Sequence, residues 1–187
     1  MLLPDKSMER WRLQAAMVMA TMGLFVAMLV LNEWLFTSLE FARGINFIYL
    51  PGGVRLLSTL LFAQAGALGL LLVSWLVCFL YFFPDDVVRS FMGGVLAAAA
   101  PYGVYLLAQR RYGIGSSLAN LTPRRLLLLS VAYSLASPAL HHLWFVAHGD
   151  AASLRSFAAM AIGDLSGTLI VLYLVKGLLS MWPTKKT

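Results

Sequence analysis

Cysteine is nearly absent from this sequence, which has one such residue, Cys78, among 187. A single cysteine cannot form a disulfide within the chain, and it excludes zinc and iron–sulfur sites that need several cysteine ligands. Cys78 lies in an apolar run, where we expect it to act as a small buried hydrophobe. We predict neither a metal centre nor a cofactor.

Charged residues are also scarce. They make up 12% of the chain, against 60% hydrophobic residues, and the mean hydropathy is +0.81. Soluble domains contain about 25% charged residues, so this composition indicates an integral membrane protein. At about 20 residues per membrane crossing, the length suits one bundle of about five to seven helices. We expect residues 1–187 to form a single transmembrane domain in a lipid bilayer.

Acidic residues are the rarer charged type, with 8 against 14 lysines and arginines, which gives a net charge of +6. The basic residues lie at the ends of apolar runs. In such positions they are typical of membrane topology signals and of contacts with anionic headgroups. We therefore expect no nucleic-acid partner.

The apolar runs predict an all-α bundle of about six transmembrane helices, at about 13–36, 51–62, 67–83, 87–108, 125–146 and 154–181. The first run is too long for a cleaved signal peptide, so it is expected to remain as a crossing. The second run is short for a bilayer of about 30 Å, and residues from Ile45 are expected to add to its depth. The segment Gln64-Ala65-Gly66 is expected to link the second and third helices.

Six crossings place the N-terminus, the loop at 109–125 and the C-terminus on one side of the membrane. That side holds most of the basic residues: Lys6, Arg10, Arg12, Arg110, Arg111, Arg124, Arg125, Lys176, Lys185 and Lys186. The other side holds Arg43, Arg89 and Arg155. Because basic loops favour the cytoplasmic side, we predict that both termini are cytoplasmic in a bacterial inner membrane.

A proline, two glycines and a charge follow one another at Pro51, Gly52, Gly53 and Arg55. Proline suits the first turn of a helix and cannot continue a preceding one, so it predicts a helix start here. Arg55 would then lie inside the membrane, where a charge is costly and usually has a partner. The best partner in the sequence is Asp164.

Further polar residues are predicted close to this pair. Glu33 ends the first crossing, His141 and His142 lie in the outer part of the fifth, and Asp164 lies about ten residues into the sixth. Two interpretations stay open: Arg55 and Asp164 form a buried ion pair that fixes helix packing, or they build a ligand site. The guanidinium would suit an anionic or planar polar ligand. The adjacent histidines point about 100° apart on a helix, so we expect only one to face the bundle.

Gly163 and Gly167 flank Asp164 with a GxxxG spacing that is typical of close helix packing in membranes. Such packing would hold the backbone of Asp164 against a neighbouring segment. The serines are scattered, and none lies in a Gly-x-Ser-x-Gly elbow. We therefore expect a protein that is not an enzyme.

Two motifs, Leu50-Pro51-Gly52-Gly53-Val54-Arg55 and Gly163-Asp164-Leu165-Ser166-Gly167, resemble the pattern of the MASE1 group of bacterial membrane sensor domains. The resemblance covers most of the chain loosely and these motifs more closely. It implies a multi-helix input module of the kind usually fused to a histidine kinase or a diguanylate cyclase. We therefore expect a stand-alone, sensor-like protein that binds a small ligand or a partner and signals through a partner membrane or signalling protein.

Two alternative functions stay open. The chain is also similar to the substrate-binding subunits of energy-coupling-factor vitamin transporters, which have about six helices, cytoplasmic termini, an outward-facing pocket and an AxxxA face on the first helix. Ala16 and Ala20 provide that spacing here. A non-catalytic accessory subunit of a larger membrane complex would also fit the small size of the chain.

Overall fold

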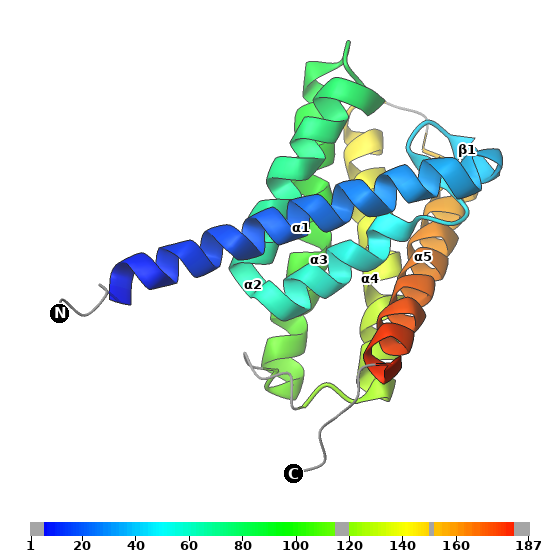
Figure 1. The fold of residues 1–187 in the computed structure, drawn as a ribbon. Helices are drawn as coiled ribbons and strands as arrows, with labels where there is room; N and C mark the ends of the chain where they lie inside the picture. Colours follow the sequence, from blue (N-terminus) through cyan, green and yellow to red (C-terminus); the bar gives the residue numbers. More distant parts are fainter. Residues whose placement is uncertain (1–5, 115–119, 150–151, 182–187) are drawn as a thin grey trace.

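The computed structural model describes residues 6–114, 120–149 and 152–181. Within them the chain forms α1 (Lys6–Phe36), η1 (Thr37–Leu39), β1 (Glu40–Ala42), β2 (Ile45–Asn46), α2 (Leu50–Val77), η2 (Cys78–Phe82), α3 (Val87–Tyr112), α4 (Pro123–Ala147) and α5 (Leu154–Met181) (Figure 1). In the described part of the chain, five segments are long and apolar enough to cross a membrane, and α2 and η2 together form one of them. The predicted all-α membrane bundle is thus confirmed.

The helix α2 is broken at Ala63, whose backbone has φ 49° and ψ −119°. Beyond the break the chain folds back, and Gly66 packs so closely on the backbone of Ser58 that a Cβ on Gly66 would overlap the Ser58 carbonyl oxygen. We call residues 50–62 the first arm and 64–82 the second arm; in Figure 1 they form a V. The sequence predicted this link at Gln64-Ala65-Gly66, whereas the reversal occurs just before it.

A short hairpin connects α1 to the first arm. Strands β1 and β2 pair antiparallel, with Glu40 opposite Asn46. The turn needs a left-handed residue, which Gly44 supplies at φ 79°. The N–H of Gly44 donates a hydrogen bond to Oε1 of Glu40 at 3.1 Å. The hairpin therefore closes on itself before the chain returns to the bundle.

An extended segment, residues 46–49, runs from the hairpin along α5. The N–H of Tyr49 donates to the carbonyl oxygen of Gly163 at 3.1 Å. A Cβ on Gly163 would overlap the carbonyl oxygen of Asn46, and one on Gly167 would overlap that of Tyr49. The predicted close packing at the GxxxG spacing is present, but its partner here is extended backbone.

The first arm begins inside the bundle, and a neighbouring helix caps it. The side-chain Oδ1 of Asn32, on α1, accepts a hydrogen bond from the Leu50 N–H at 2.8 Å. Pro51 follows in the first turn, where its missing N–H costs nothing. The predicted start at Pro51 is confirmed to within one residue.

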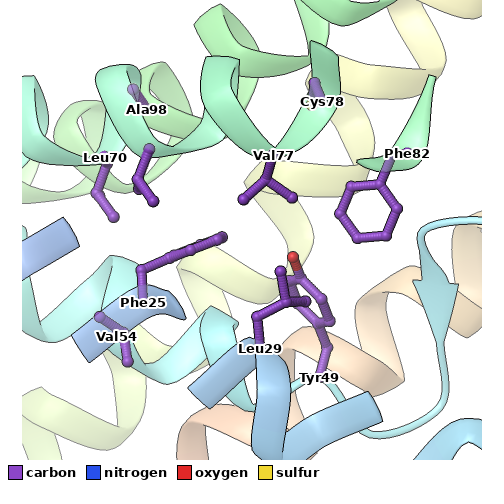
Figure 2. Packing of buried hydrophobic residues seen from close by; sticks show 10 residues of the cluster. Phe25, Leu29, Tyr49, Val54, Leu70, Val77, Cys78, Phe82 and Ala98 are labelled. Atoms are coloured by element: carbon purple, nitrogen blue, oxygen red, sulfur yellow. The ribbon is translucent and has the colours of Figure 1, made fainter. Parts of the chain in front are cut away.

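The helix α2 is the centre of the bundle, since it packs against α1, α3 and α5, while α4 packs against α3 and α5. One apolar cluster joins α1, both arms and α3 (Figure 2): Phe25, Leu29, Tyr49, Val54, Leu70, Val73, Val77, Cys78, Phe82 and Ala98. A second cluster joins the first arm to α3 and α4, with Tyr133 fully buried in it. Cys78 is buried, as expected.

The bundle has two distinguishable ends. At the hairpin end, Nη2 of Arg43 donates to the carbonyl oxygen of Tyr81 at 2.6 Å, which ties the hairpin to η2. At the opposite end, the reversal at Ala63 shares a hollow with Arg10 of α1 and Gln109 of α3.

Candidate functional site

A cavity of about 90 Å³ lies inside the hairpin end of the bundle; we call it the central cavity. Its wall includes residues of all five α-helices and of the hairpin. The polar and charged side chains are Arg43, Asn46, Tyr49, Arg55, Ser74, Arg89, His141, Trp144 and Asp164. The apolar wall includes Phe25, Val77, Phe82, Phe83, Leu96, Phe145 and Met160. The cavity is therefore the point where the elements of the fold converge.

The two sequence motifs meet at the wall of this cavity. A Cβ on Gly52 would lie 2.9 Å from Oδ1 of Asp164, and a Cβ on Gly53 would lie 2.6 Å from Cβ of Val171. Only glycine leaves room for this approach of the first arm to α5. Gly52 and Gly53 thus allow the first arm to pack closely against Asp164 and Val171 of α5.

Asp164 is 4% exposed, so its carboxyl group is almost wholly enclosed by protein. The hydroxyl of Tyr133, on α4, donates to Oδ1 of Asp164 at 3.3 Å. A buried carboxyl group needs such donors, because it has lost its water. Asp164 is therefore linked to α4 as well as to the first arm.

Arg55 lies on the first arm with its guanidinium between aromatic rings. Its Cζ is 5.4 Å from the ring centre of Phe25 and 5.1 Å from that of Tyr49. Its Nη2 makes a long hydrogen bond of 3.4 Å to the Tyr49 hydroxyl. Arg55 and Asp164 line the same cavity. These two described residues do not form a direct ion pair, because their hydrogen bonds go to Tyr49 and Tyr133.

Arg89 provides a second guanidinium from α3. Its backbone is fixed by the first turn of that helix, where Oδ1 of Asp86 accepts the Arg89 N–H at 2.9 Å. The Cζ of Arg89 lies 4.3 Å from the ring centre of Phe83 and 5.6 Å from that of Phe145. The guanidinium groups of Arg55 and Arg89 therefore both lie over aromatic rings. Such cation–π contacts are favourable, because the face of an aromatic ring attracts a positive charge.

Several enclosed polar atoms on the cavity wall have no hydrogen-bond partner within the described part of the chain. They are Nδ2 of Asn46, Nε of Arg55, Oγ of Ser74, Nε of Arg89 and Nε1 of Trp144. Asn46 is 3% exposed and Ser74 is 2% exposed. Buried polar groups nearly always have a hydrogen-bond partner in folded proteins. The concentration of unpartnered polar atoms at this cavity therefore makes it the candidate site.

The predicted site residue Glu33 lies outside this wall. It is near the end of α1, and its Oε2 accepts a hydrogen bond from the hydroxyl of Tyr81 at 3.3 Å. Tyr81 belongs to η2 at the hairpin end. Glu33 therefore contributes to the contact between α1 and the second arm.

The two histidines face different surroundings. His141 lines the cavity, and its Nδ1 lies 2.8 Å from the carbonyl oxygen of Ser137. His142 instead turns to α5, where its Nε2 lies 2.9 Å from Oγ of Ser156. Over residues 6–114, 120–149 and 152–181, no three His, Cys, Asp or Glu side chains gather in a way that could hold a metal ion.

Sequence reasoning missed Asn46, Arg89 and Tyr133 as site residues. Asn46 and Arg89 read as ordinary loop and helix-end residues, and only the fold brings them to the cavity. A usable signal did exist for Tyr133, because Tyr133, Ser137 and His141 recur at every fourth position of α4. Such spacing places them on one helix face.

No protein-family model, curated protein or solved structure matches this chain. The fold and the cavity therefore define the class: a multi-helix membrane protein with a small, polar, donor-rich cavity inside one end of its bundle. The likeness to MASE1 sensor domains remains a prediction.

Proposed function

We propose that this protein is a non-catalytic, sensor-like membrane protein that binds a small ligand in the central cavity. The observation that carries this proposal is the convergence of all five α-helices and the hairpin on one cavity wall. A ligand there contacts every major element, so it can favour one packing arrangement of the bundle over another. A shift between packing arrangements on ligand binding is what a sensor domain requires to pass on a signal.

The proposal includes a topology of six crossings with both termini in the cytoplasm. The reversal at Ala63 supports it, since residues 46–62 lead from the hairpin end to the opposite end and the second arm leads back. Basic residues gather at the opposite end: Arg10, Arg12, Arg110, Arg111, Arg124 and Arg125. By the preference of basic loops for the cytoplasm, the central cavity lies towards the outer face of a bacterial inner membrane.

The signal would pass to a partner membrane or signalling protein. The resemblance of the Pro51-Gly52-Gly53 and Gly163-Asp164 motifs to MASE1 sensor domains supports this role. The contact of Gly52 with Asp164 gives the two motifs a shared place at the ligand cavity. In the same proposal, ligand binding alters this contact and thereby the position of the first arm against α5.

Ligand retention tests the proposal. The protein is purified in mild detergent, denatured, and its released small molecules are identified by mass spectrometry. Leu96 lines the cavity, so Leu96→Trp should fill it. Leu107 is on the same helix but is 59% exposed, so Leu107→Trp is the matched control.

We expect a compound to be released by the wild type and by Leu107→Trp, and at least tenfold less of it by Leu96→Trp. Both variants must elute as folded, monodisperse protein for the comparison. Equal release from all three would show that the compound does not occupy the cavity. In that case the ligand-binding role would have to be abandoned.

A transporter subunit is the second candidate, favoured by the exposure of Ala16 and Ala20 on α1. Small exposed residues let another membrane helix approach closely. Ala16→Leu would then abolish stable co-purification with a membrane complex that contains an ATPase pair, without loss of the retained compound. Co-purification with a larger complex, with no compound released by any preparation, would instead favour an accessory subunit.

A further inference from the structure

We propose that the central cavity receives an anionic group bearing oxygen atoms, a carboxylate or a phosphate, and that Arg55 and Arg89 hold it from two helices. This inference rests on the proposed ligand-binding function and specifies the ligand's chemistry. It follows from four features of the cavity wall: its free donors, its charge, the rigidity of its arginines and its size.

Among the described residues, four of the five enclosed, unpartnered polar atoms on the wall are N–H donors, and the fifth, Oγ of Ser74, can donate or accept. Arginine and the indole of tryptophan have donors and no acceptor. Within the described chain, Nε of Arg55, Nε of Arg89 and Nε1 of Trp144 are enclosed and unpartnered, as is the amide Nδ2 of Asn46. A ligand that satisfies these atoms must present hydrogen-bond acceptors to the wall.

The charge of the wall favours the same ligand. Among the residues that the structure describes, the cavity wall has three arginines, Arg43, Arg55 and Arg89, and a single carboxyl group, that of Asp164. Even when Asp164 is ionised and accepts the Tyr133 hydroxyl at Oδ1, the three guanidinium groups leave the wall with an excess of positive charge. Burial in a medium of low polarity strengthens the attraction of this excess for an anion.

The two inner arginines are held ready for such a contact. Stacking of the guanidinium of Arg55 over Phe25 and Tyr49 leaves its in-plane N–H groups accessible for hydrogen bonds. Nη2 makes the long bond to the Tyr49 hydroxyl, and Nε has no partner within the described chain. Phe83 and Phe145 support the guanidinium of Arg89, on α3, in the same way. Charge-assisted hydrogen bonds from guanidinium to carboxylate or phosphate are the strong ones.

The volume limits the size of the group. A cavity that holds one water needs about 10–15 Å³, and an apolar cavity of about 150 Å³ takes benzene. The volume of about 90 Å³ therefore suits a carboxylate or phosphate with a few further atoms, and is too small to enclose a whole nucleotide. The group can come from a small anion in solution or from the headgroup of an anionic lipid.

Thermal unfolding of the purified protein tests this inference in two arms. In detergent, the probes are sodium phosphate and sodium acetate, with sodium chloride at equal ionic strength as the reference and ethylammonium chloride as a cationic probe. In nanodiscs, phosphatidylcholine alone is compared with phosphatidylcholine containing phosphatidylglycerol. Arg89→Gln removes the charge and keeps a donor, and Arg155→Gln removes an exposed charge from the same end of the bundle.

We expect phosphate or acetate, or else phosphatidylglycerol, to raise the unfolding midpoint of the wild type and of Arg155→Gln. The apparent affinity of Arg89→Gln for the same anion should be about tenfold or more below that of the wild type, as expected for the loss of a charge-assisted hydrogen bond. An effect in the detergent arm identifies a soluble anion, and an effect only in nanodiscs identifies a lipid headgroup. Arg55→Gln provides the same measurement from the first arm if Arg89→Gln does not fold.

Three results would overturn the inference: no anion acts in either arm, ethylammonium acts as strongly as the anions, or Arg155→Gln loses as much affinity as Arg89→Gln. The failure is distinguishable from failure of the proposed function. If a neutral or cationic compound is retained by the wild type and lost from Leu96→Trp, the binding function stands and the anion assignment falls.

Discussion

At the scale of single residues, the structure depends on glycines that admit backbone rather than side chains. A methyl group at Gly163 would overlap the carbonyl oxygen of Asn46. Gly163→Ala should therefore lower the free energy of unfolding by about 1–3 kcal/mol, the usual cost of overpacking a tight contact. Titration with a denaturing detergent in mixed micelles measures this change.

The control lies on the same helix. A Cβ on Gly177 would meet nothing within 4 Å, so Gly177→Ala should be neutral or should stabilise α5 by up to about 1 kcal/mol, the ordinary helix gain of alanine over glycine. Equal destabilisation by both changes would mean that α5 does not tolerate substitution in general. It would remove the argument for close packing of residues 46–49 on α5.

Arg55 and Asp164 provide the second prediction at this scale. They share a cavity without a direct ion pair, so each charge depends on the other through a medium of low polarity. Arg55→Gln and Asp164→Asn should each destabilise the protein, and the double change should cost less than their sum by about 0.5–3 kcal/mol. The unfolding free energies of the four proteins give this coupling.

Glu33 supplies the control for that cycle, since it contacts Tyr81 and does not line the cavity. Arg55→Gln and Glu33→Gln should be additive within about 0.5 kcal/mol. Coupling of Arg55 to Glu33 as large as that to Asp164 would indicate a diffuse charge effect. The cavity pair would then have no special relation.

At the scale of elements, the segment that leads into α2 differs most from what the sequence predicted. The pattern of apolar residues was sufficient to predict α1, α3, α4 and α5, together with the start of α2 near Pro51. It could not predict that residues 46–49 enter the bundle as extended backbone, because the hydrogen bonds that permit this come from α5, over 110 residues later. The close packing at the GxxxG spacing was therefore predicted correctly, but the expected partner was a helix and the actual partner is the extended backbone of residues 46–49.

The site shows the same division. Arg55 and Asp164 could be predicted because ionisable residues are rare within apolar runs. Asn46 and Trp144 could not, because asparagine in a loop and tryptophan near a helix end are common at membrane interfaces. Only the tertiary arrangement turns them into unpartnered donors on one wall.

The reversal of α2 leads to the prediction at this scale. Ala63 has φ 49°, a conformation that costs a residue with a Cβ about 1–3 kcal/mol and costs glycine little. Ala63→Gly should therefore stabilise the protein. Ala65, two positions later, has helical backbone, and Ala65→Gly should destabilise it by about 0.5–1 kcal/mol.

The opposite signs of these two alanine-to-glycine changes are the measurement that matters, and thermal unfolding in detergent provides it. A continuous helix through residue 63 would give a loss of stability for both. Such a result would remove the reversal, and with it the first arm as a separate crossing.

At the scale of the whole molecule, the number of crossings decides which termini and loops share a side of the membrane. If the two arms of α2 cross separately, the start of α1 and the end of α3 lie on one side, and the turn before α3 lies on the other. If α2 crossed once, the start of α1 would lie on the side opposite the end of α3. Single cysteines distinguish the two cases.

The chain suits this experiment because Cys78 is its only cysteine, and Cys78→Ala gives a background free of thiols. Into it are placed Glu9→Cys, Asp85→Cys and Gln109→Cys, all at exposed positions. In intact cells a membrane-impermeant maleimide should label only the cysteine at position 85, and after permeabilisation it should label all three. Labelling of position 109 alone, or of positions 9 and 85 together, would contradict six crossings, because positions 9 and 109 would then lie on opposite sides of the membrane and α2 would cross it only once. Labelling of 9 and 109 but not of 85 would keep the six crossings and invert them, which would turn the central cavity towards the cytoplasm.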